Sequence, residues 1–323
     1  MARAATGLPF DDMRRLADGP PLPDMEAAEA VAARAEPGLG QLQELAEWLA
    51  AWQGRAEPAL VEPLVAVFAA NHGLLDQDIS AETMAATQER VELIAAGGAP
   101  VSRAALQSNV GLKVFDLALD LPTPDITRED AFDEAGCAAT MAFGMEAVAG
   151  GTDLLCVTDI GAGNRVVAAA LAHALFGGQP ADWLPEDEGD AALRERQIAA
   201  VSAAVARLDG GAADPLEILR RIGGREFAAI AGAILAARYQ KIPVLLDGPV
   251  ALVSAALLQK LNPATVAHCR VAEAGRGPGM ARLLTETGLA PLFDLGLEGG
   301  NGLGAVLAVD LCKTAAVAVQ QAR

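Results

Sequence analysis

The sequence DLLCVTDIGAGNRVVAAALAHALFGG, from Asp153 to Gly178, is typical of a strand, a glycine turn and a helix in succession. Its apolar start, Asp153 to Val157, predicts a short buried strand, and Asp159 to Asn164 are expected to form the turn. The alanine-rich helix that follows is expected to end at Gly177. Backbone N–H groups at such a turn, together with the helix dipole, favour an anion. The stretch therefore indicates either a phosphate or carboxylate site, or a turn that only reverses the chain.

The composition fits a globular α/β protein and argues against binding to nucleic acid. The chain has 323 residues, of which 52% are hydrophobic and 20% charged, enough for one large domain or two modest ones. With 42 acidic against 24 basic residues, the net charge of -18 repels nucleic acid and anionic membranes. Aromatic residues make up only 4% of the chain, which is a poor supply for stacking on bases. We therefore expect a small-molecule ligand.

Cysteine and histidine usage points to a cytoplasmic protein without a metal or another cofactor. Four widely spaced cysteines form no C-x-x-C motif, and no signal peptide is evident. They are Cys137, Cys156, Cys269 and Cys312. The three histidines are not spaced as metal ligands; they are His72, His173 and His268. No apolar run approaches the length of a membrane span, about 20 residues, so no membrane association is expected.

Strands alternate with helices along most of the chain. Besides the opening strand, buried strands are predicted at Pro63–Ala70, Gly111–Leu119, Ile242–Leu246 and Ala264–Val271. This order predicts an α/β fold, a parallel Rossmann-like sheet flanked by helices. Ligands of such sheets bind at the carboxyl ends of the strands, where His72, the turn from Asp159 and Asp247 are expected.

The two ends of the chain are expected to pair. Residues 1–60 are predicted to form an arm and a small helical domain, residues 61–300 the α/β domain, and residues 301–323 a helix that completes the small domain. Met1 to Pro23 is interpreted as a loosely held arm. Apolar residues recur at helical spacing from Leu42 to Trp52, which predicts packing against the main body.

Several short motifs occur in an order that resembles a known family. They are Asn71-His72-Gly73, Ala142-Phe143-Gly144-Met145-Glu146, Gly161-x-Gly163-Asn164, Gly223-Gly224-Arg225-Glu226, Leu246-Asp247-Gly248 and Asp294-Leu295-Gly296. In this order they are similar to those of the nicotinate-nucleotide:dimethylbenzimidazole phosphoribosyltransferases. The resemblance runs from about Pro9 to the last helix. It implies a homodimer that transfers ribose 5-phosphate from nicotinate mononucleotide to a benzimidazole-type base, a step that makes the lower ligand of cobalamin.

The chain departs from the family's pattern where the resemblance implies the chemistry. The family turn G-E-M-G-I-G-N-T-T appears here with Asp159 for the glutamate and with Arg165 and Val166 for the two threonines. The family's catalytic glutamate, in R-L-G-E-G-[ST]-G, aligns with Asn301, and the phosphate lysine aligns with Gln197. Asparagine cannot accept a proton near pH 7. Glu298, three residues earlier, could take over only if the loop is rearranged.

Two interpretations follow for the site and the activity. The catalytic candidates are Asn301, Glu298 and Asp159, the last of which could instead only cap the following helix. The substrate-binding candidates are Gly161, Gly163, Asn164, Arg165, Ser80, Met84, His72, Asp247 and Gly302. One interpretation is an active transferase with a changed base slot or a relocated general base. The other is an inactive member that binds a related ligand, or that serves as partner subunit of an active homologue in a heteromer.

Overall fold

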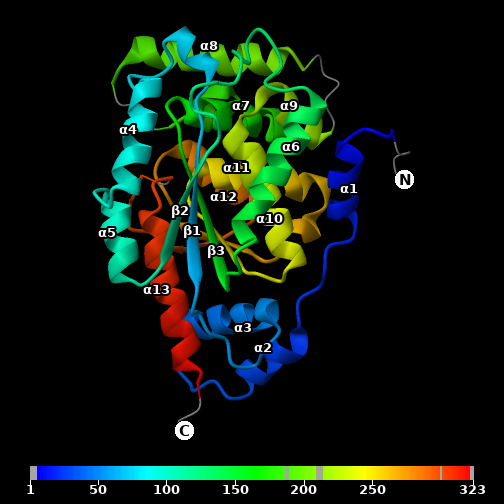
Figure 1. The fold of residues 1–323 in the computed structure, drawn as a ribbon, viewed down its shortest axis with the longest axis vertical. Helices are drawn as coiled ribbons and strands as arrows, with labels where there is room; N and C mark the ends of the chain where they lie inside the picture. Colours follow the sequence, from blue (N-terminus) through cyan, green and yellow to red (C-terminus); the bar gives the residue numbers. More distant parts are fainter. Residues whose placement is uncertain (1–5, 186–188, 209–213, 299, 321–323) are drawn as a thin grey trace.

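A computed structural model describes residues 6–185, 189–208, 214–298 and 300–320. Its centre is one six-stranded sheet in which every neighbouring pair of strands is parallel. In spatial order the strands are β2 (Gly111–Asp116), β1 (Pro63–Ala69), β3 (Leu154–Ile160), β4 (Val244–Leu246), β5 (Cys269–Glu273) and β6 (Pro291–Phe293). Helices flank the sheet, as predicted (Figure 1). All the carboxyl ends therefore meet at one edge.

Strand β3 shows why the sheet is sandwiched between helices. All seven of its residues are buried, and alternate side chains point to opposite faces. Leu155 and Val157 belong to one hydrophobic core, whereas Leu154 and Cys156 belong to the other. A continuous apolar strand of this kind requires cover on both sides, which fixes the layered architecture.

Helices from the middle of the chain cover the first face. They are α6 (Glu134–Met145), α7 (Asn164–Phe176), α8 (Ala191–Ala206), α9 (Pro215–Ile222), α10 (Arg225–Tyr239), α11 (Pro249–Leu261) and α12 (Pro278–Thr287). Helices α6 and α10 approach closely enough to bring their backbones into contact at two glycines. A Cβ atom on Gly232 would lie 1.8 Å from the carbonyl oxygen of Met141, and one on Gly144 would lie 1.9 Å from that of Ala229.

The opposite face is covered by helices from both ends of the chain. They are α2 (Met25–Ala32), α3 (Gln41–Gln53), α4 (Met84–Ala95), α5 (Pro100–Gln107) and α13 (Leu303–Ala318). In Figure 1, α2 and α3 lie at the lower end of the molecule beside α13. The predicted apolar face of α3 packs into this core through Leu45, Trp48 and Leu49. The hydrophobic core that α3 joins also contains residues of the sheet strands. The division of the chain into two domains stays a prediction.

Four expectations about local structure were wrong. The predicted N-terminal arm contains α1 (Phe10–Asp18), where Phe10 is fully buried and its N–H donates to Glu134 Oε1 at 2.8 Å. The strand predicted at Ala264–Val271 begins only at Cys269. Strand β6 was not predicted, because it has only three residues. Strand β3 runs on to Ile160, so Asp159 lies within the strand. Short 3₁₀ helices occur at Gly73–Gln77, Glu146–Val148, Pro180–Trp183 and Pro263–Val266.

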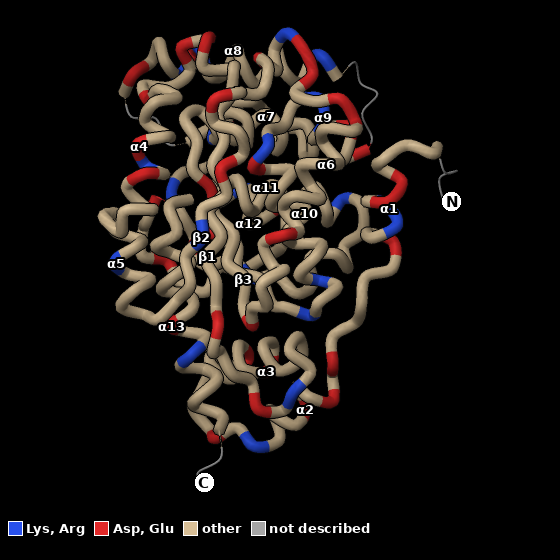
Figure 2. Tube along the Cα trace, in the orientation of Figure 1, with Lys and Arg blue, Asp and Glu red and all other residues tan. Residues whose placement is uncertain are grey.

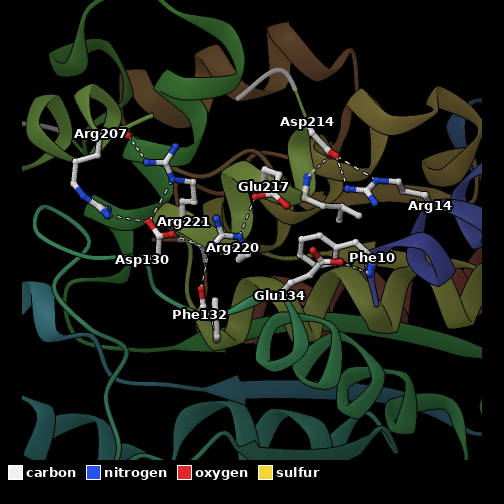
Figure 3. Close-up of polar contacts among 11 residues, drawn as sticks. Phe10, Arg14, Asp130, Phe132, Glu134, Arg207, Asp214, Glu217, Arg220 and Arg221 are labelled. Carbon is white, nitrogen blue, oxygen red and sulfur yellow. Dashed lines mark hydrogen bonds and ion pairs between the residues drawn. The ribbon is translucent and has the colours of Figure 1, made fainter. Parts of the chain in front are cut away.

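An ion-pair cluster fixes the segment that precedes α6 (Figure 3). Three arginines from α9 and the end of α8 surround the Asp130 carboxylate, with Arg207 at 2.9 Å, Arg220 at 2.8 Å and Arg221 at 3.3 Å. Burial raises the pKa of Asp130, but the hydrogen bonds from Arg220 and Arg207 outweigh it, and the net shift is downward. Asp130 is therefore held ionised, and its segment is clamped onto the first face of the sheet.

Charged residues gather at the periphery of the molecule and are sparse in its middle (Figure 2). The four cysteines are buried free thiols. No helix among the described residues is long and apolar enough to cross a membrane.

A buried histidine contributes to acid sensitivity. His268 is fully buried, its Nε2 lies 3.0 Å from the Ile234 carbonyl oxygen, and its ring packs edge-on against Trp52. Burial and the nearby Arg238 guanidinium lower the pKa of His268 to about 3. The neutral ring is thus preferred in the folded state. Its contribution to stability is present above the unfolded pKa of about 6.5 and is lost as the pH falls toward the folded value.

We therefore expect the free energy of unfolding to fall by about 2 kcal/mol between pH 7 and pH 5 on account of His268 alone. Urea unfolding at the two pH values measures the drop in the wild type and in His268→Gln. The variant lacks the titrating ring and is expected to lose less stability over this interval. Equal losses in the two proteins would contradict the assignment.

Candidate active site

A cavity of about 600 Å³ lies where β3 passes into α7. Its walls come from segments far apart in the sequence: the segment before α4, helices α4, α5, α7 and α8, and the loop before α13. The predicted site residues that line it are Ser80, Asp159, Gly161, Gly163, Asn164, Arg165, Glu298 and Asn301. The structure thus brings together the opening turn and the late glycine-rich turn, as the parallel sheet predicts.

The turn requires two glycines. Gly163 is the N-cap of α7 with a φ of 76°, a left-handed conformation that L side chains rarely adopt. A Cβ atom on Gly161 would lie 2.8 Å from the carbonyl oxygen of Ala70. Because the N-cap is glycine, no side chain at that position occupies the first-turn N–H groups of α7. The Val166 N–H donates to the Gly163 carbonyl oxygen at 3.0 Å, and the remaining N–H groups at a helix start of this kind can bind an anionic group.

Asp159 forms part of the cavity wall and is 4% exposed. Its Oδ2 accepts a hydrogen bond from Asn164 Nδ2 at 2.5 Å. Among the described residues its Oδ1 has no hydrogen-bond partner. Burial, followed by the negative charge of Glu226, raises the pKa of Asp159 well above its usual range, and Arg165 opposes this. An isolated oxygen on a buried carboxyl group at a cavity wall is suited to meet a hydrogen-bond donor of a ligand.

Arg165 and Glu298 lie next to each other at the cavity wall. Arg165 Nη2 lies 4.0 Å from Glu298 Oε2, with the side chains 43% and 64% exposed. Both residues also line a smaller hollow of about 40 Å³ that includes Arg276. Asn301 Oδ1 accepts from the Leu303 N–H at 3.1 Å, and its Nδ2 donates to the Glu298 carbonyl at 3.3 Å. The Asn301 amide therefore supports the turn as well as lining the cavity.

Two buried carboxylates anchor the loop that carries Glu298 and Asn301. Glu273 Oε1 accepts from the N–H groups of Leu295 at 3.0 Å and Leu297 at 3.2 Å. Asp247 Oδ2 accepts from the Gly302 N–H at 2.9 Å and from Thr158 Oγ1 at 3.3 Å. Burial raises the pKa of Asp247 to about 6. The loop is thus tied to the ends of β4 and β5.

Four predicted substrate-binding residues lie outside the cavity lining. Asp247 and Gly302 are buried against each other at the start of α13, and Met84 is half-buried on α4. His72 is 1% exposed, and its Nε2 lies 2.7 Å from Oε1 of the buried Glu226. Direct contact of these four residues with a ligand stays a prediction.

The sequence did not reveal the apolar residues of the cavity wall or two of the arginines that line it. Arg90, Leu93 and Ile94 line the cavity from α4, and Val101 lines it from α5. The spacing of the first three places them on one face of a helix, a signal that could have identified the wall. Arg194, on α8, donates to the carbonyls of Pro185 and Ala181 at 2.7 and 2.9 Å. Gln197, at the position of the family's lysine, lines the cavity and donates to the Ile79 carbonyl.

Comparisons with known proteins agree over nearly the whole chain. A family model described as a phosphoribosyltransferase matches residues 22–323. Nicotinate-nucleotide–dimethylbenzimidazole phosphoribosyltransferase of Brucella melitensis biotype 2 is 50% identical over 321 residues, 97% of this chain and 95% of that protein. The enzyme of the same name from Rhizobium etli is 51% identical over 320 residues, 97% of this chain and 94% of that protein.

Structural similarity leads to the same family. The crystal structure of nicotinate-nucleotide–dimethylbenzimidazole phosphoribosyltransferase from Thermus thermophilus superimposes with a TM-score of 0.85 at 33% identity. The match covers 93% of this chain and 97% of that one. This chain therefore belongs to the nicotinate-nucleotide–dimethylbenzimidazole phosphoribosyltransferase family.

Proposed function

We propose that this protein transfers ribose 5-phosphate from nicotinate mononucleotide to a benzimidazole-type base. Family membership supports the reaction class. The observation that carries the proposal is the buried Asp159 carboxyl group, whose unpartnered oxygen lies at the wall of a cavity large enough for a nucleotide and a flat base.

The reaction requires one proton acceptor. A lone pair on the acceptor's ring nitrogen attacks C1′ of the ribose, and the bond from C1′ to the pyridinium nitrogen breaks. The bonding electrons stay with that nitrogen, which leaves in nicotinate as a neutral pyridine ring. The attached benzimidazole is then a cation and loses the proton from its other nitrogen. A carboxylate within hydrogen-bond reach of that N–H lowers the barrier by accepting the proton in the transition state.

Asp159 is the strongest of the three candidates for that role. The amide of Asn301 cannot accept a proton near neutral pH. Glu298 is 64% exposed and lies 4.0 Å from Arg165, so water and the guanidinium compete with the substrate N–H for contact with its carboxylate. Asp159 is buried and fixed by Asn164, and its raised pKa makes it a better proton acceptor once it is ionised. In this proposal Glu298 helps to place Arg165.

The rest of the cavity suits the two substrates. Leu93, Ile94 and Val101 supply an apolar wall for a flat base. The start of α7 supplies backbone N–H groups, and Arg165 supplies a positive charge for the donor phosphate. In this proposal Arg165 takes the role of the family's phosphate lysine, whose position is occupied here by Gln197.

We also propose that the protein works in the cytoplasm as a homodimer. Four buried free thiols support a reducing compartment. The resemblance to the family supports the homodimer. Native mass spectrometry distinguishes a homodimer from a monomer, and co-purification with a homologous chain would instead support the heteromer.

A chromatographic assay tests the proposed function. The purified chain is incubated with nicotinate mononucleotide and 5,6-dimethylbenzimidazole, and both nicotinate and the ribosylated base are measured. Equal amounts of the two products are expected, and purine or phenol acceptors tried in parallel define the base slot. Absence of nicotinate release with every acceptor, together with absence of binding by calorimetry, would overturn the proposal and favour the inactive member.

A further inference from the structure

A buried threonine joins the glycine turn before α7 to the helix that carries the apolar wall of the cavity. Thr87, in the first turn of α4, is 1% exposed. Its Oγ1 accepts a hydrogen bond from the Ala162 N–H at 3.1 Å, although the two residues are 75 positions apart in the sequence. Thr87 lies outside the cavity lining, and the reaction described above does not use it directly.

This hydrogen bond decides which backbone groups of the turn can meet a ligand. Gly161, Gly163 and Asn164 line the cavity, whereas Ala162 is 1% exposed and lies outside the lining. A buried N–H without a partner is costly, and Thr87 supplies the partner for Ala162. The Ala162 N–H is therefore not available to an anion. Binding of an anion is left to the N–H groups that follow it at the start of α7.

The turn is also packed against the segment that leads from β1 to α4. A Cβ atom on Gly163 would lie 2.8 Å from Ile79 Cδ1 and 3.0 Å from Leu75 Cδ2. These close approaches limit how far the turn can move toward that segment, but they do not set the direction in which its N–H groups point. The hydrogen bond to Thr87 does set a direction, because such bonds weaken steeply when donor and acceptor are misaligned.

Thr87 lies on the same face of α4 as residues of the cavity wall. Arg90 follows it by three positions and Ile94 by seven, which is the spacing of neighbours along one helix face, and both line the cavity. One helix thus carries the apolar wall proposed for the base and the acceptor that holds the turn proposed for the phosphate. The two parts of the cavity are connected through Thr87.

We propose that Thr87 is a positioning residue that holds the glycine turn in the conformation that binds the phosphate of the donor. This inference rests on the proposed function and adds a residue that acts on the donor only through the Ala162 backbone. Without the Thr87 hydroxyl, the Ala162 N–H is buried without a partner. The turn then rotates to satisfy it, and the neighbouring N–H groups no longer converge on the phosphate.

Thr87→Val tests the hydrogen bond, because valine keeps the branched shape of threonine and lacks its oxygen. Kinetics of the full chain at pH 7, with each substrate varied in turn, should show KM for nicotinate mononucleotide raised about tenfold. KM for 5,6-dimethylbenzimidazole should change by less than about threefold, because the turn is not part of the wall for the base. Calorimetry with nicotinate mononucleotide alone should show the same loss of affinity, about tenfold.

Two further variants separate this effect from a general loss of stability. Thr87→Ser keeps the hydroxyl oxygen and should hold KM for the donor within about threefold of the wild type. Thr287→Val is the matched control on α12, where Thr287 is 5% exposed and its Oγ1 donates to the Leu283 carbonyl at 2.7 Å. It also removes a buried threonine hydroxyl, but outside the cavity lining, and should leave both KM values unchanged.

Hydrogen exchange at single amides of the wild type supplies a test that needs no variant. The Ala162 amide is expected to be protected whether or not nicotinate mononucleotide is bound, because its partner is Thr87. The amides of Gly163 and Asn164 are expected to gain protection when nicotinate mononucleotide binds.

The outcomes separate the inference from the function on which it rests. A folded Thr87→Val variant that binds the donor as tightly as the wild type would contradict the inference alone. An equal rise in both KM values would also contradict it, because the threonine would then be merely structural. If Thr87→Val did not fold, an Ala162 amide that gains protection only with bound donor would refute the inference, and one already protected would support it. A wild type that neither binds the donor nor releases nicotinate would overturn the proposed function and the inference together.

Discussion

Asp159→Asn is expected to lower kcat by about 100- to 10,000-fold, the usual range for loss of a general base. The variant keeps the shape of the side chain and an oxygen for Asn164 Nδ2, so the loss would reflect the missing proton acceptor. Steady-state measurement of nicotinate release gives kcat and KM. Asparagine cannot carry a negative charge beside the pyridinium ring of the donor, so KM for the donor is also expected to rise.

Two controls make this result decisive. Glu298→Gln removes the exposed carboxylate opposite Arg165 and is expected to change kcat by no more than about tenfold. A large loss of kcat in Glu298→Gln with little loss in Asp159→Asn would show that Glu298 is the proton acceptor.

The pKa of Asp159 is raised in the folded state, so the folded protein loses stability as the pH rises through this pKa and the carboxyl group ionises. Urea unfolding at pH 8 should therefore find Asp159→Asn at least as stable as the wild type.

Gly232→Ala is expected to destabilise the protein by more than about 3 kcal/mol. The added methyl group would lie 1.8 Å from the carbonyl oxygen of Met141, which is backbone in α6 and cannot rotate away. Alanine gains about 1 kcal/mol of helix propensity over glycine, too little to offset separating two packed helices. Urea unfolding of both proteins at pH 7 measures the difference.

Gly150→Ala is the matched control for this substitution. A Cβ atom there meets no other atom within 4 Å, and the residue does not have a positive φ. Its stability should stay within about 1 kcal/mol of the wild type. A stable Gly232→Ala variant would show that α6 and α10 can move apart without cost.

The sequence predicted the layers of the fold because its strands are apolar throughout. A run such as Leu154 to Val157 can be buried only in a sheet covered on both faces, and the alternation with helices made the sheet parallel. The start of α7 after Gly163 was also predicted correctly, because a glycine turn before an alanine-rich helix is a local signal. Strand β6, with three partly buried residues, gave no comparable signal.

The candidate site was predicted only in part because its polar partners are distant in sequence. Asp159 looked like a turn residue, since an aspartate within a buried strand makes sense only once Asn164 and the cavity are in place. His72 and Glu226 are 154 residues apart, and no local pattern joins them. Their pairing depends on how β1 and α10 pack, which the three-dimensional structure supplies.

The anchoring of the loop before α13 has an evolutionary consequence. Glu273 holds Leu297 and Asp247 holds Gly302, so the backbone enters and leaves the cavity at points fixed to the sheet. Substitutions between these points, including those at Glu298 and Asn301, can change the chemistry of the cavity while the attachment stays the same. Reactive groups in this loop can thus be exchanged or lost during evolution while the fold stays unchanged.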